Sequence, residues 1–125
     1  MNIPLQARAP FVLVKTKEAY QLWHNNLVNL KRLDRYTTGA KIDETFLFLL
    51  ELIFKASFAN DKFEKFSLIS QAIVKCDLLK FFLQLNWENK IICLKIYSSL
   101  ILSLDEIGRM LGGWKKSLEN KTPAK

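Results

Sequence analysis

The chain has 125 residues, of which 50% are hydrophobic and 25% charged, a composition typical of a folded domain and not of a disordered chain. The net charge of +7 makes polyanions such as nucleic acids reasonable partners, while 4 Gly and 3 Pro are too few for a turn-rich β-sandwich or barrel. The 2 cysteines are too few for a disulfide scaffold. We expect a soluble cytoplasmic protein that does not enter membranes, since we find no secretory signal and no apolar run of the ~18 residues that span a bilayer.

The chain begins with an irregular segment and one predicted helix. Residues 1–15 are expected to form an extended lead-in, because Pro4 and Pro10 disfavour regular structure there. From about residue 17 the apolar side chains recur at helical spacing, which predicts a first helix that ends at a short joint over residues 36–39. A threonine of this joint is expected to cap the next helix.

Two longer helices are predicted in the middle of the chain, over residues 38–58 and 62–88. Between them, Asp61 and Glu64 have the spacing of a capping box, which marks the start of a helix. Asn89 is expected to end the third helix, because asparagine tolerates the left-handed conformation that often follows a helix.

A fourth helix is predicted over residues 90–111, with Gly112 and Gly113 ending or kinking it and residues 119–125 forming a flexible tail. Four helices with short connections favour an all-α fold, an antiparallel up-down-up-down four-helix bundle. Residues 1–125 are then expected to form a single domain.

The second and fourth predicted helices are more apolar than a small bundle requires. A surface helix needs an apolar stripe only slightly wider than ~100°. The second helix is apolar on nearly all sides, and so is the run of residues 91–97. Four helices cannot enclose one of their own number completely, so we expect the surplus to be buried against another copy or another protein. The alternative is a bundle that tolerates exposed apolar side chains.

Residues suited to catalysis or metal binding are scarce. His24 is the single histidine and is interpreted as a surface or interface side chain, while Cys76 and Cys93 lie in apolar stretches and are interpreted as small core residues. The pairs Asp43–Glu44 and Asp105–Glu106 diverge by about 100° on a helix, so surface salt bridging is the better interpretation. The sequence therefore predicts no enzyme, no metal site and no cofactor.

Basic side chains gather in two places, around the first joint and near the C-terminus. These clusters are the candidate nucleic-acid-binding sites, and they are expected to contact phosphates without reading the bases. The first consists of Lys31, Arg32, Arg35 and Lys41, and the second of Arg109, Lys115 and Lys116. The alternative is a solvated basic face, with Arg109 paired to Asp105 four residues earlier. The two clusters are expected at opposite ends of the bundle. In an oligomer, several copies of the chain would repeat each cluster and form a belt of positive charge.

Two motifs go beyond a generic bundle. They are Arg35-Tyr36-Thr37-Thr38-Gly39, followed by Ile42-Asp43, and Leu104-Asp105-Glu106-Ile107-Gly108-Arg109-Met110-Leu111-Gly112-Gly113-Trp114. Over about residues 10–118 the chain resembles the accessory variability determinant (Avd) proteins of diversity-generating retroelements. These belong to a wider group of four-helix bundle proteins that includes those encoded in 23S rRNA intervening sequences. The second-helix start typical of the rRNA-insert branch is absent.

The resemblance implies a concrete function. Avd-like proteins form ring-shaped homopentamers, lack catalytic activity, bind RNA or DNA through basic surfaces and associate with the reverse transcriptase of the element. Together they support mutagenic copying of a template RNA into cDNA. The remaining alternative is a structural scaffold for protein–protein interaction whose basic surface is incidental.

The motif residues are expected to have structural or interface roles. Gly39 permits a close or left-handed backbone at the joint. Tyr36 is expected to pack on the end of the bundle, with stacking against a base or partner as the alternative. Gly112 and Gly113 are expected to let the backbone turn, so that Trp114 packs back or reaches a neighbouring molecule.

Overall fold

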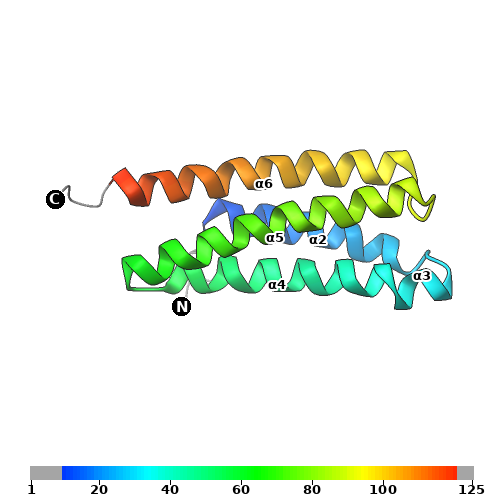
Figure 1. Ribbon diagram of the computed structural model, residues 1–125, viewed down its shortest axis with the longest axis horizontal. Coiled ribbons are helices and arrows are strands. Elements are labelled where there is room, and N and C mark those ends of the chain that lie inside the picture. Colours follow the sequence, from blue (N-terminus) through cyan, green and yellow to red (C-terminus); the bar gives the residue numbers. More distant parts are fainter. Residues whose placement is uncertain (1–9, 121–125) are drawn as a thin grey trace, which may run out of the picture.

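The structure is a computed structural model that describes residues 10–120. Its helices are α2 (Phe11–Leu27), α3 (Arg32–Tyr36), α4 (Thr38–Phe58), α5 (Lys62–Glu88) and α6 (Leu94–Asn120), and no strand occurs in this range. Consecutive long helices run in opposite directions, with α2 against α4 and α6, and α5 against the same two helices (Figure 1). The predicted all-α four-helix bundle is therefore confirmed.

The first helix begins earlier than predicted. Residues 11–15, expected to belong to an extended lead-in, form the first turns of α2. Pro10 occupies the N-cap position and its carbonyl accepts a hydrogen bond from the Leu13 N–H at 3.0 Å. Proline is tolerated at a helix start, where its missing N–H would have had no partner. Burial of Val12 and Leu13 then anchors this turn. Residues 1–9 lie outside the described range.

The first helix also ends earlier than predicted, because the chain breaks between α2 and α3. The carbonyls of Asn26 and Leu27 accept turn hydrogen bonds from Asn29 and Leu30, and Lys31 then adopts an extended conformation. Asparagine has weak helix propensity, which favours this break. Leu30 is buried as a result, and the five-residue α3 follows as a separate helix.

The predicted bounds of the second and third helices are confirmed by α4 and α5. Asp61 is the N-cap of α5, and its carboxylate accepts a hydrogen bond from the Glu64 N–H at 3.0 Å. The predicted threonine cap of α4 is wrong. Thr37 is at the N-cap position, but its hydroxyl donates to the carbonyl of Leu33 at 2.8 Å instead of capping α4.

The turn between α5 and α6 places a lysine in the left-handed conformation. The N–H of Lys90 donates to Trp87 O and that of Ile91 to Asn86 O, at 3.0 and 2.8 Å. This is the Schellman pattern, whose left-handed position is usually a glycine. Lys90 holds that position with a φ of 61°, whereas Asn89, the residue expected to be left-handed, has a φ of −89°.

Helix α6 is shifted along the chain relative to the prediction. It begins at Leu94 instead of residue 90 and continues without a break through Gly112 and Gly113. The two glycines therefore do not end the helix, because the packing of Leu111, Trp114 and Leu118 on the core continues on both sides of them. Residues 119 and 120, expected in a flexible tail, are helical, and residues 121–125 lie outside the described range.

The core is built from one apolar stripe of each long helix. Its largest fully buried side chains are Trp23, Phe46, Ile42, Leu49, Ile53, Ile69, Leu79, Leu83, Leu100, Leu104, Ile107 and Leu111. Cys76 belongs to this core as predicted, and its Sγ donates to the Leu104 carbonyl at 3.4 Å. Cys93 is exposed in the turn before α6, so its predicted place in the core is wrong.

Salt bridges tie α6 to its neighbours. Asp105 Oδ1 lies 3.1 Å from Lys80 Nζ on α5, and Glu106 Oε1 lies 3.1 Å from Lys15 Nζ on α2. Burial acts to lower the pKa of Lys80, but its hydrogen bond to Asp105 and the nearby negative charges raise it overall. Salt bridging of the acidic pairs is confirmed for Asp105 and Glu106, and also for Glu44, whose carboxylate lies 3.5 Å from Lys41 Nζ.

Large apolar side chains remain exposed on the outside of the bundle. On α4 and α5 they are Leu47, Phe48, Phe54, Phe58, Phe63, Val74, Phe81 and Trp87, and on α6 they are Leu94 and Leu102. The surplus of exposed apolar surface predicted for the second helix is confirmed by α4. That of the fourth helix is smaller than predicted, because Ile92 is buried and Ile91, Ile96 and Tyr97 pack partly against the core. The surplus on α5 was not predicted.

Candidate nucleic-acid interface

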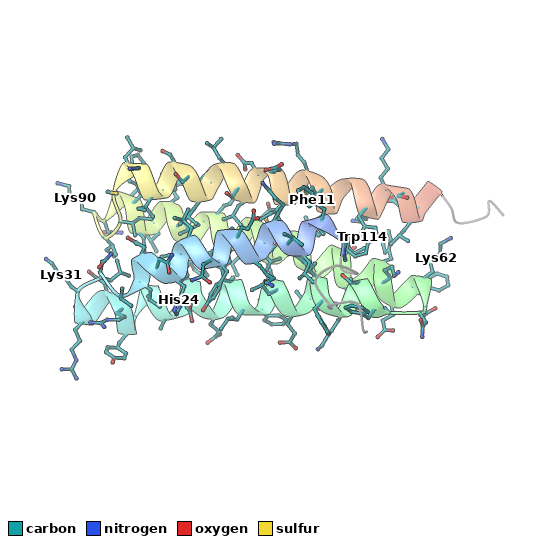
Figure 2. The ribbon with its side chains drawn as sticks, turned by 180° about the vertical axis from the view of Figure 1, so that it is seen from behind. Phe11, His24, Lys31, Lys62, Lys90 and Trp114 are labelled. Atoms are coloured by element: carbon teal, nitrogen blue, oxygen red, sulfur yellow. The ribbon has the colours of Figure 1, made fainter. Side chains whose placement is uncertain are left out.

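One end of the bundle collects basic residues from segments far apart in the sequence. We call it the joint end and define it as residues 28–41 together with residues 86–93. Figure 2 shows Lys31 and Lys90 at this end, whereas Lys62 and Trp114 lie toward the other end. The first predicted basic cluster is therefore located at the joint end.

Helix α3 presents the cations of this cluster. Lys31 and Arg32 are exposed and Arg35 is partly buried, and none of the three forms an ion pair within residues 10–120. Lys41 is exposed on the first turns of α4 and is paired with Glu44. Cations without an internal counterion keep their charge available for an external anion such as a phosphodiester.

Tyr36 projects from the end of α3 and remains 69% exposed. The guanidinium carbons of Arg32 and Arg35 both lie 5.9 Å from the centre of its ring, at the outer limit of a cation–π contact. The expected packing of Tyr36 on the bundle end is therefore wrong. No residue of α3 is fully buried, and the Tyr36 ring and Arg32 are exposed side by side, while Arg35 is half-buried beside them.

A hollow of about 600 Å³ lies beside α3 and brings Lys90 into the site. It is lined by Asn29, Leu30, Lys31, Asp34, Thr38, Leu85, Asn89, Lys90 and Ile91. Lys31 and Lys90, which are 59 positions apart in the sequence, thus border one hollow. Asp34 is the acidic side chain among its lining residues. Sequence reasoning missed Lys90, because only the antiparallel packing of α4 and α5 places the α5–α6 turn beside α3.

Several buried polar atoms at the joint end lack a hydrogen-bond partner within the described part of the chain. They include Thr38 Oγ1, which belongs to a residue of the hollow, Arg35 Nε, and both amide atoms of Asn86. A buried polar group without a partner costs about 1–3 kcal/mol. Such atoms also occur elsewhere in the described bundle, for example Trp23 Nε1 and Ser70 Oγ.

The second predicted cluster lies in the second half of α6 and is divided between two faces. Arg109 and Lys116 are exposed and seven residues apart, so they share one face of α6. Lys115 points elsewhere, with its Nζ 5.3 Å from the centre of the Phe66 ring on α5. The alternative interpretation paired Arg109 with Asp105. In the structure the Asp105 carboxylate binds Lys80 instead.

The two motif regions have structural roles that the sequence only outlined. Gly39 is buried where α3 meets α4, and its φ is not positive, so close approach and not a left-handed backbone requires it. Trp114 is half-buried and packs back on the core, where it borders a small apolar hollow with Phe11, Val12 and Met110.

Among the other polar side chains, His24 and Asp43 both lie next to Tyr20. His24 is exposed as predicted, with its ring centre 5.7 Å from that of Tyr20. Burial and a hydrogen bond to Asp43 raise the pKa of Tyr20 to about 12, so Asp43 faces Tyr20 instead of a surface cation. Within residues 10–120, no three His, Cys, Asp or Glu side chains lie together as metal ligands. In the same range, no helix has both the length and the apolar character to cross a bilayer.

Comparison with known proteins identifies the family. A family model described as bAvd-like matches residues 11–118 and so includes both motifs, the joint end and nearly all of the four long helices. No curated protein and no solved structure matches the chain. Since the matched range covers most of its length, the chain belongs to the bAvd-like family.

Proposed function

We propose that this protein is a non-catalytic accessory protein of a diversity-generating retroelement that binds RNA or DNA through the joint end. Family membership supports the accessory role. The observation that carries nucleic-acid binding is the grouping of Lys31, Arg32, Arg35 and Lys90 at one end of the bundle without internal ion pairs within the described residues. Such a surface neutralises several phosphates and requires no base-specific contact.

The two basic clusters serve as matched controls for each other. The variant Lys31→Glu/Arg32→Glu/Arg35→Glu changes the charge by the same amount as Arg109→Glu/Lys115→Glu/Lys116→Glu, but at the joint end instead of in the second half of α6. Retention of structured RNA and duplex DNA is measured for both variants over a range of salt concentrations, with circular dichroism to confirm folding.

We expect the joint-end variant to lose most binding and the distal variant to keep most of it. The wild-type affinity is expected to fall steeply with salt, since phosphate neutralisation releases counterions. Equal losses in both variants would indicate a response to net charge alone. A folded protein that binds neither nucleic acid at low salt would contradict the proposal and favour a protein-only scaffold.

Association with the reverse transcriptase of the element is the second part of the proposal. It is supported by the family membership and is tested by co-purification with the reverse transcriptase encoded beside this gene. We expect a complex that persists after nuclease treatment. A complex that disappears with the nucleic acid would mean that RNA bridges the two proteins and that they do not bind directly.

The third part is assembly into a ring-shaped homopentamer, which the exposed apolar side chains of α4 and α5 support. Light scattering is expected to give five times the chain mass of 14.6 kDa. The variant Leu47→Glu/Phe54→Glu places charge on the apolar face of α4 and is expected to dissociate the ring without unfolding the bundle. Val28→Glu, at an exposed position outside the helices, is the control that should leave the mass unchanged.

A further inference from the structure

Hydrogen bonds on either side of Tyr36 fix the backbone that carries its exposed ring. The N–H of Arg35 donates to the Lys31 carbonyl at 2.9 Å, which closes the turn of α3. The Thr37 hydroxyl donates to the Leu33 carbonyl at 2.8 Å, and Gly39 lies against the carbonyl of Asp34. Little backbone freedom therefore remains to be lost at this segment when a flat ligand covers the ring.

The surroundings of the ring are cationic. The two guanidinium groups at 5.9 Å belong to arginines without an ion pair in the described part of the chain, and Lys31 directly precedes Arg32. An exposed aromatic ring next to unpaired cations combines a surface for stacking a base with groups that bind the adjoining phosphates. This combination is typical of binding to single-stranded nucleic acid.

From this arrangement we infer that Tyr36 stacks on an unpaired base, so that the joint end prefers single-stranded RNA or DNA to a duplex. The inference rests on the nucleic-acid binding proposed above and adds the class of nucleic acid. In a duplex both faces of each base are covered by its neighbours, and a tyrosine ring would meet only the backbone.

A protein partner is less compatible with this end of the molecule. The exposed phenylalanines, which suit burial against another protein, lie on α4 and α5, except for Phe11 at the start of α2. Around Tyr36 the side chains are mainly cations, although Leu33 is 74% exposed. Repulsion among unpaired cations is relieved by a polyanion and not by an apolar surface.

The test compares Tyr36→Leu, which removes the ring, with Tyr36→Phe, which keeps it. Phe11→Leu is the matched control, because Phe11 is also an exposed ring, 63% exposed, but lies at the start of α2, away from the joint end (Figure 2). Affinity is measured for a short oligouridine that forms no base pairs and for an RNA duplex of equal length, over a range of salt concentrations. Association with the reverse transcriptase is measured in parallel.

We expect Tyr36→Leu to weaken oligouridine binding by about tenfold, and to leave duplex binding and the salt dependence unchanged, since it removes no charge. Tyr36→Phe and Phe11→Leu should bind as the wild type does. Equal binding by Tyr36→Leu and wild type, or an equal loss for both RNAs, would overturn the inference, as would a loss of reverse transcriptase binding alone. If only this inference fails, the wild type still binds RNA and the joint-end charge reversal still removes most of that binding. If the proposed function fails, the wild type itself binds no RNA.

Discussion

Gly39 lies so close to the carbonyl oxygen of Asp34 that a Cβ atom at Gly39 would be 2.8 Å from it. The same atom would be 3.1 Å from a methyl group of Leu30 and 3.3 Å from one of Leu27. This contact fixes α3, with its cations and Tyr36, on the start of α4. The absence of a side chain at one position thus sets the geometry of the candidate site.

The variant Gly39→Ala is expected to lower the free energy of unfolding by about 1–3 kcal/mol, because the added methyl group must push a backbone carbonyl away. Gly113→Ala is the control, since a Cβ at this helical position has open space around it. It is expected to raise the same free energy by up to ~1 kcal/mol. Urea denaturation measures both, and equal effects of the two substitutions would contradict the contact at Gly39.

Lys90 adopts a left-handed conformation that disfavours any residue with a Cβ. The variant Lys90→Gly is therefore expected to raise the free energy of unfolding by about 1 kcal/mol. Lys90→Ala removes the same charge without relieving the strain. Both variants should bind RNA more weakly than the wild type, while only the glycine variant gains stability in thermal denaturation. Unchanged RNA affinity in both would exclude Lys90 from the interface.

The two thiols are expected to react at very different rates. Cys93 is exposed, whereas Cys76 is 1% exposed and burial raises its pKa to about 11. At pH 8 a disulfide reagent should therefore modify Cys93 rapidly and Cys76 only after denaturation, because the thiolate is the reactive form. The variant Cys93→Ser should lose the rapid phase. A rapid phase that survives in this variant would show that Cys76 is accessible in the folded protein.

Tyr20 should make stability depend on pH in the alkaline range. Its pKa is raised from 10.0 to about 12 by burial, with further contributions from the hydrogen bond and charge of Asp43. A raised pKa in the folded state means that the stabilisation is complete below pH 10 and is lost as the pH rises through about 12.

The wild type is therefore expected to lose more stability between pH 10 and 12 than Tyr20→Phe, by an amount on the order of 1 kcal/mol. Urea denaturation at several pH values in this range measures the difference. The phenylalanine variant keeps the titration of all other groups, so parallel pH profiles of the two proteins would show that Tyr20 ionises freely in the fold.

Local signals predicted the middle of the fold well. The bounds of α4 and α5 follow from chemistry within a few residues, such as the Asp61 carboxylate that accepts the Glu64 N–H. The errors occur where local signals are weak or ambiguous. Pro10 suits both an extended segment and a helix start, and Gly112 and Gly113 are tolerated within α6 because the core holds the helix on both sides.

The candidate site was predicted in part. Lys31, Arg32 and Arg35 are close in sequence, so their grouping on one short segment could be expected. The exposure of Tyr36 could not, since an aromatic residue after a helix packs inward or outward according to how that helix docks. The exposure of Cys93 has the same origin, because the turn that holds it depends on the Schellman bonds after α5.

The sequence by itself determined the helical class of the protein, its basic character and its family resemblance, because helical periodicity, charge and short motifs are properties of the chain. Only the tertiary structure decided which side chains meet. Lys31 and Lys90 border the same hollow because antiparallel packing returns the chain to the joint end after α5. Arg109 lies about halfway along α6, well away from the joint end where that helix begins, because a rigid helix fixes the separation of its residues.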